Sequence, residues 1–276
     1  MATVGGRGVR LGAVACFAML AALAAAGCGS SSVTPAIIYV TDSPAPATPL
    51  PSGVTPAPIV TPVSPVIDSV VISSNAPDNS WQVTFKKPVI SGVSAAASTK
   101  MNDTITAQVN GYISAFTGGG LPAVASGDGP STLSGDFTIA LDSPTLISLR
   151  FSVLTYVTGA AHPTSAPGSL NFVVSSGAKI NLADIFSNPT AALTTIASQS
   201  HAALTTLLGS DLIWSGSASS LSFFDKAWAM TPFGLEFTWA QGDIASEASG
   251  MPSATLAWSA IKSLIKTDGP AGEFVG

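Results

Sequence analysis

The placement of proline divides this chain into a part that disfavours regular structure and a part that can build a core. The sequence has 20 prolines, and nine of them lie between residues 29 and 67. Proline fixes φ and lacks a backbone N–H, so this density disfavours helix and sheet and favours extended polyproline II. We therefore interpret residues 28–67 as a disordered linker and place the folded domain at residues 68–268, followed by a tail at 269–276.

The first 28 residues have the pattern of a bacterial lipoprotein signal. Arg7 and Arg10 precede an uncharged apolar run over residues 11–26, which is shorter than the roughly 20 residues of a membrane span. The run ends in LAAAGC, with a small residue directly before Cys28. This ending resembles a lipoprotein processing site and implies removal of residues 1–27 and lipid on Cys28. Two acyl chains would hold the protein stably at the outer face of the cell membrane. The alternative is an ordinary secretory signal that leaves Cys28 free.

Cysteine and charge counts narrow the classes of function. The two cysteines are Cys16, inside the predicted signal, and Cys28, so residues 29–276 contain no thiol and no disulfide. The net charge is −5 and only 9% of the residues are charged, which offers no basic patch for a nucleic acid. Two histidines without an available cysteine argue against a transition-metal site. We expect no cofactor, no metal and a monomer that is stabilised by its core alone.

Hydrophobic periodicity predicts both helices and strands in the domain. Apolar residues recur at helical spacing over residues 95–115 and 189–208, and the second segment begins with Asn188 and Pro189, a favoured N-cap and first position. Alternating apolar residues predict strands at 81–85, 137–141, 145–157 and 169–175 and a hairpin within 222–240. Because hairpins dominate the pairing, we predict an α+β fold in which antiparallel sheet hairpins pack with two main helices.

Residues that could carry chemistry are few and scattered. The sequence contains no Gly-x-Ser-x-Gly, no glycine-rich phosphate loop and no His-Glu-x-x-His motif. His162 precedes Pro163 in the loop predicted between strands 145–157 and 169–175, where a turn residue is typical and a catalytic base is the alternative. Asp243 and Glu247 would share a face if their segment were helical, and could then bind a cation or act as an acid–base pair. Trp214, beside serine and glycine, is the candidate for an exposed aromatic at an interface.

Two motifs resemble a known family. Residues 159–163 read Gly-Ala-Ala-His-Pro between two strand signals, and residues 247–250 read Glu-Ala-Ser-Gly before an alternating strand and Ser-Ala-Ile at 259–261. Together they resemble the RsiV/MPT64-like family, whose DUF3298 domain with a DUF4163-like N-terminal part occurs in a lysozyme-sensing anti-sigma factor and beside a peptidoglycan deacetylase. The resemblance covers roughly residues 145–265. It implies an envelope-facing, non-catalytic α+β domain that binds a protein or a wall component.

These observations predict a cell-envelope lipoprotein whose extracellular domain binds a lysozyme-like protein or a peptidoglycan-related ligand. An envelope hydrolase, esterase or glycan-acting, that uses His162 or the Asp243/Glu247 pair is a second hypothesis. A structural surface antigen is a third. The abundance of alanine, glycine and proline is compatible with a high-GC Gram-positive source. The candidate binding residues are His162, Trp214, Asp243 and Glu247, and the turn residues are Gly159, His162 and Pro163.

Overall fold

The structure of this protein is a computed structural model that describes residues 64–122, 124, 129–214 and 220–276. The predicted signal, Cys28 and nearly all of the predicted linker lie outside these residues, so lipidation stays a prediction. Within the described part of the chain, no helix is both long and apolar enough to cross a membrane.

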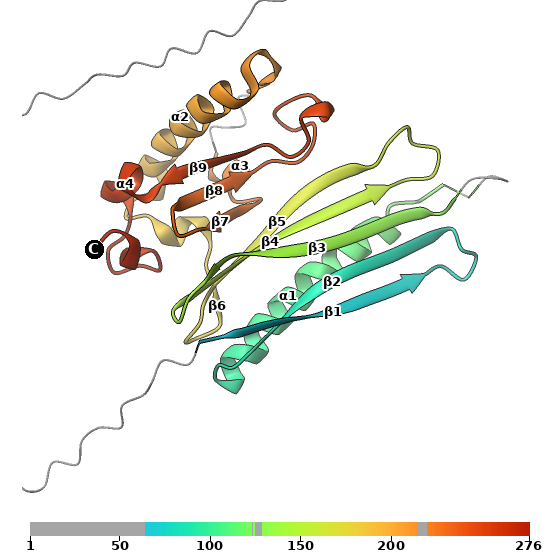
Figure 1. Ribbon diagram of the computed structural model, residues 1–276, viewed down its shortest axis with the longest axis horizontal. Coiled ribbons are helices and arrows are strands. Elements are labelled where there is room, and N and C mark those ends of the chain that lie inside the picture. The colour runs from blue at the N-terminus through green and yellow to red at the C-terminus, as the bar shows by residue number, and fades with distance from the viewer. Residues whose placement is uncertain (1–63, 123, 125–128, 215–219) are drawn as a thin grey trace, which may run out of the picture. The chain divides into compact units, whose positions relative to one another are not determined.

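A six-stranded sheet in the order β1-β2-β3-β4-β5-β6 forms the larger layer (Figure 1). Neighbouring strands are antiparallel except β2 and β3, which run parallel. A parallel pair needs a crossover connection, and helix α1 supplies it. These elements are β1 (Val66–Asn75), β2 (Trp81–Ser91), α1 (Ala95–Thr117), β3 (Ser131–Asp142), β4 (Leu146–Tyr156), β5 (Thr164–Val173) and β6 (Ala178–Lys179).

Helix α1 covers one face of this sheet and confirms the helix predicted at 95–115. Ser94 caps its start, because the serine side chain accepts a hydrogen bond from the N–H of Ala97. Met101, Ile105 and Val109, spaced four residues apart, are fully buried in the core between helix and sheet. The apolar stripe that predicted the helix is therefore also the stripe that anchors it.

Tyr112 of α1 lies so close to β5 that only glycine fits at residue 168. A Cβ on Gly168 would lie 1.8 Å from the Tyr112 hydroxyl, so no side chain fits there. The Tyr112 ring stacks on Phe85 with the centroids 6.0 Å apart and leans against Phe151. Burial raises the pKa of Tyr112, because the ionised phenolate loses solvation in this core.

A three-stranded antiparallel sheet and helix α2 form the smaller layer (Figure 1). The Asn188 side chain accepts a hydrogen bond from the N–H of Ala191, which confirms the predicted start of α2. One apolar residue of the predicted helix lies outside the core, since Leu207 is 63% exposed, whereas Leu208 packs against the core. The elements are α2 (Pro189–Leu208), α3 (Leu221–Phe224), β7 (Trp228–Met230), β8 (Gly234–Thr238), β9 (Ser253–Ala257) and α4 (Trp258–Ile261).

The folded domain is longer than the predicted 68–268. Strand β1 begins at Val66. At the other end, Phe274 stacks on Trp258 with the ring centroids 4.5 Å apart, and Val275 is buried in the core of the smaller layer. Residues 269–276 are thus part of the domain and not a tail. They pack through short irregular turns, which have no periodicity for a sequence pattern to reveal.

Side chains of the larger sheet hold β7 in place, although β7 pairs with none of its strands. Ser148 donates a hydrogen bond to Asn171 and accepts one from the N–H of Met230. Asn171 donates to the carbonyl of Trp228, and Ser169 accepts from the N–H of the same residue. Ser148 and Asn171 are 0% and 2% exposed. We name Ser148, Ser169, Asn171 and the β7 backbone the junction cluster. It satisfies backbone groups of an edge strand that would otherwise be buried without partners.

Replacing two fully buried serines by alanine should change the stability of the domain in different ways, because only one of them has hydrogen-bond partners. Ser148→Ala leaves the N–H of Met230 with only a longer contact to Asn171 and should lower the free energy of unfolding by about 1–3 kcal/mol. Ser200, equally buried in α2, has a hydroxyl without a partner among the described residues. Ser200→Ala should therefore be neutral or stabilising by up to about 1 kcal/mol. Urea unfolding of both variants measures this, and equal losses of stability would contradict it.

The partly buried phenol of Tyr112 predicts a loss of stability at alkaline pH. Because folding raises the pKa of Tyr112 above its ordinary value of 10.0, the folded state keeps this proton longer than the unfolded state does. The free energy of unfolding therefore falls as the pH rises above 10.0. Tyr112→Phe removes this titration, so its stability should fall less between neutral and alkaline pH than that of the native chain. Urea unfolding at both pH values tests this, and equal alkaline losses would refute it.

Candidate ligand-binding pocket

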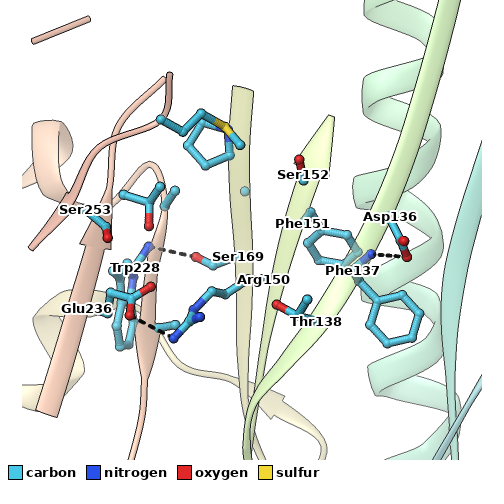
Figure 2. Close-up of a pocket in the computed structure, with 16 residues that line it drawn as sticks. Asp136, Phe137, Thr138, Arg150, Phe151, Ser152, Ser169, Trp228, Glu236 and Ser253 are labelled. Atoms are coloured by element: carbon cyan, nitrogen blue, oxygen red, sulfur yellow. Dashed lines mark hydrogen bonds and ion pairs between the residues drawn. The ribbon is translucent and has the colours of Figure 1, made fainter. Parts of the chain in front are cut away.

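A pocket with a volume of about 450 Å³ lies between the two sheets (Figure 2). Strands β3, β4 and β5 contribute one wall, and the β7–β9 layer contributes the other. Leu149 and Phe151 of β4 are buried in the α1 core, so Arg150 and Ser152 between them face the other way, into the pocket. The pocket thus occupies the face of the larger sheet that α1 leaves free.

An ion pair crosses from one sheet to the other at this pocket (Figure 2). The Arg150 Nη2 atom lies 2.9 Å from Glu236 Oε2. The Glu236 side chain is 18% exposed and that of Arg150 is 35% exposed, so both charges are partly withdrawn from water. The Arg150 Nε atom is buried and has no hydrogen-bond partner within the described residues. The pair therefore presents a donor and an acceptor side by side while its two charges compensate each other.

The rest of the lining combines hydroxyl groups with apolar surface. Asp136 adds a second carboxylate, but its side chain is 67% exposed and lies 3.8 Å from Lys86 Nζ. The cation in the lining, Arg150, is already paired with Glu236, which disfavours an anionic ligand. The hydroxyl residues are Thr138, Ser152, Ser169, Thr238 and Ser253, and the apolar residues include Pro167 and Met251. Phe137, Phe151 and Trp228 also lie along the lining, but their rings pack into the two hydrophobic cores. A neutral ligand with several hydroxyl or amide groups and an apolar face matches this lining.

Arg150 and Glu236 are not among the candidate residues predicted from the sequence. The available signal was a single charged residue at the centre of an otherwise uncharged strand, in LISLRFSVLTY and in GLEFT. A lone charge within alternating apolar residues indicates either a solvent-exposed face or a buried partner. Only the packing of β8 over β4 shows that Arg150 and Glu236 are each other's partner.

The two family-like motifs meet at one end of the pocket region. His162 Nε2 lies 2.9 Å from Glu247 Oε2. Beside this pair, the backbone of Ser165 exchanges two hydrogen bonds with Gln241, whose side-chain amide also donates to the carbonyl of Glu247. The segment that carries the late acidic motif is thereby docked on the start of β5. His162 and Glu247 are absent from the pocket lining, but they close the end opposite the junction cluster.

The turn at His162 is shorter than predicted. The hairpin connection occupies residues 157–163, and β5 begins at Thr164, so much of the predicted loop is strand. Pro163, Pro167 and Gly168 made this stretch resemble a loop, but ten residue pairs with β4 override that local preference. Gly159 has a φ of 86°, which agrees with its predicted place in the turn.

The helical pairing considered for Asp243 and Glu247 is wrong. Their segment consists of turns, with a single 3₁₀ turn at Glu247–Ser249. Gly242 has a φ of 84°, which an α-helix does not accommodate. Asp243 is exposed, and Glu247 pairs with His162. In the described part of the chain, no group of three or more His, Cys, Asp and Glu residues could hold a metal ion.

Trp214 is half-buried at the margin of an aromatic cluster. Its ring lies 5.9 Å from that of Phe223 and 6.2 Å from that of Trp239, both edge to face. The exposed ring of His201 covers it from α2 at 5.2 Å. Trp214 is thus less available than predicted, and its role in binding stays a prediction. The serine and glycine that follow it lie outside the described residues.

Comparisons with known proteins identify the fold. No family model and no curated protein matches the sequence. A solved structure of a DUF3298 family member from Bacteroides fragilis is similar, with a TM-score of 0.55 and 14% identity, over 77% of this chain and 98% of that chain. The chain has the DUF3298 fold. A DUF3298 family protein from Pseudomonas aeruginosa is similar at a TM-score of 0.52 and 10% identity, over 73% of this chain and 94% of that chain.

The DUF3298 fold confirms two predictions made from the sequence. The α+β class with two main helices is as expected, and the family resemblance suggested by two short motifs holds over most of the chain. At 10% and 14% identity, the likeness concerns the fold alone. The evidence for a ligand therefore comes from the pocket of this chain.

The His162–Glu247 pair predicts a small effect on stability. The two side chains are 50% and 55% exposed, so water and salt screen their attraction. A double-mutant cycle with His162→Ala and Glu247→Ala should give a coupling of less than about 1 kcal/mol in urea unfolding. A coupling of several kcal/mol would contradict this and would make the pair a main support of the hairpin.

Proposed function

We propose that this protein is a non-catalytic binding module of the cell envelope, held to the membrane by lipid on Cys28, that binds a peptidoglycan-related glycan in the pocket between its sheets. The observation that carries the proposal is the pocket itself. Its volume of about 450 Å³ lies within the range of small-ligand sites, and it combines a few polar groups with apolar surface.

The polar groups of the pocket match the chemistry of an N-acetylated sugar. A sugar hydroxyl or acetamido group both donates and accepts hydrogen bonds, and the Arg150–Glu236 pair offers both functions in one place. Ring hydroxyls can bond with Ser152, Ser169 and Thr238 around the pocket. The apolar face of a sugar ring has Pro167 and Met251 as neighbours. Because the Arg150 charge is already paired with Glu236, the lining favours a neutral sugar over an acidic one.

The location of the candidate catalytic residues outside the pocket favours ligand binding over catalysis. A hydrolase needs a base or nucleophile that is held against the substrate by a third group. The sequence candidates for this role are absent from the pocket lining: His162 and Glu247 pair with each other, and Asp243 is exposed. Of the charged groups that do line the pocket, Arg150 and Glu236 form an ion pair, and Asp136 lies 3.8 Å from Lys86 Nζ.

A substitution that fills the pocket tests this proposal. Ser152 is exposed on β4 within the pocket, so Ser152→Trp fills the space without removing a core contact. Ser134 is exposed on neighbouring β3 outside the pocket lining, so Ser134→Trp is the matched control. We expect diacetylchitobiose, which is neutral, to bind the native chain and the control equally. Binding to Ser152→Trp should weaken by about tenfold or more, which equals about 1.4 kcal/mol.

Calorimetric titration of residues 28–276 carrying Cys28→Ser gives the measurement. Absence of binding to every glycan fragment, or equal affinity in Ser152→Trp, would overturn the proposed ligand. Tight binding of lysozyme that is unaffected by Ser152→Trp would instead indicate a protein-binding surface elsewhere on the domain.

A further inference from the structure

Strand β1 leaves one edge of the larger sheet open. It pairs with β2 on one side and, among the described residues, with no strand on the other. None of its ten residues is buried, and Val66, Val70 and Val71 are 49%, 46% and 67% exposed. Its sequence VIDSVVISSN contains one charge and neither lysine nor proline. Soluble proteins usually protect an edge of this length with such residues, because its free N–H and C=O groups can pair with another strand.

We infer that β1 is a dimer interface, where it pairs antiparallel with β1 of a second copy around a two-fold axis at Val71. This register places Val71 opposite its own copy and Val70 opposite Ile72 of the second copy. Apolar residues thus meet apolar residues at the centre. On either side, Ser69 lies opposite Ser73 of the second copy, and Asp68 opposite its Ser74. Ser69 and Asp68 thus each meet a hydroxyl and the two aspartates do not face each other, while the outermost pair, Ile67 with Asn75 of the second copy, is mixed.

The two neighbouring symmetric registers are less complementary. An axis at Val70 would place Ser69 opposite Val71 of the second copy and Asp68 opposite its Ile72. An axis at Ile72 would place Val71 opposite Ser73 of the second copy and Val70 opposite its Ser74. Polar and apolar residues would then oppose each other next to the axis, which loses the favourable cross-strand contacts. The self-complementary pattern about Val71 is the reason to name a second copy of this chain as the occupant of the edge.

A dimer of this kind differs from the monomer expected from the sequence, and it leaves the pocket open. Two strands, β2 and β3, separate β1 from β4 in the sheet, and the pocket lies over β3, β4 and β5. Two pockets on one continuous sheet would bind a repeating polymer with avidity. That consequence rests on the proposed function, whereas the dimer itself rests only on β1.

Cysteine cross-linking tests the register, because residues 29–276 contain no cysteine. In the chain of residues 28–276 carrying Cys28→Ser, Val71→Cys places two thiols opposite each other, with the Cα atoms about 4.5–5.5 Å apart. Mild oxidation should convert most of this variant into a disulfide-linked dimer. Ser73→Cys is the matched control, since its thiol faces Ser69 of the second copy and should stay largely unlinked.

Sedimentation equilibrium tests the dimer without a cross-link. Val71→Lys places two like charges opposite each other and should raise the dimer dissociation constant about tenfold or more. Thr84→Lys, at an exposed position of the interior strand β2, should leave it unchanged. Thermal unfolding checks that both variants are folded. A native chain that sediments as a monomer, or equal cross-linking at positions 71 and 73, would overturn the inference whatever the pocket binds.

Discussion

The hydrogen bonds of the junction cluster decide how the two layers of this domain meet. Strand β7 is the edge of its own small sheet, and its backbone lies against the face of the larger sheet. Ladder hydrogen bonds cannot form in this arrangement, so Ser148, Ser169 and Asn171 replace them with side-chain hydrogen bonds. Because an unpaired buried amide or carbonyl is costly, the cluster fixes one position of β7 rather than merely allowing contact.

The pocket is a consequence of that fixed contact. Successive pairs along the β4–β5 hairpin are Ser148 with Asn171, Arg150 with Ser169, and Ser152 with Pro167. The first pair belongs to the junction cluster, where the layers touch. In the second pair, Ser169 still belongs to that cluster while Arg150 lines the pocket, and the third pair lines the pocket, where the layers separate. At the far end, Gln241 docks on the start of β5 and the layers meet again. The hairpin therefore forms one wall of a space closed at both ends by hydrogen bonds.

The two motifs that suggested the family have structural roles in this arrangement. The Gly-Ala-Ala-His-Pro turn connects the strands of the hairpin, and the late acidic motif docks beside it through His162 and Glu247. The rare histidine, which first suggested catalysis, contributes to closing the hairpin end. The charged groups best placed to meet a ligand, Arg150 and Glu236, belong to regular strands.

Local sequence patterns are enough to locate most elements of this protein. Periodicity located α1 and α2, the Asn188–Pro189 start of α2, and most of the strands, because these features depend on neighbours within one turn or one strand. Tertiary structure decided which elements meet: the extension of β5 through Pro167, the packing of residues 269–276, and the pairing of Arg150 with Glu236 across 86 positions of the chain. Such contacts leave no periodic trace, since each depends on the position of a distant segment. Local propensity therefore accounts for the individual helices and strands. The hydrogen bonds of polar groups buried between the two sheets position the pocket.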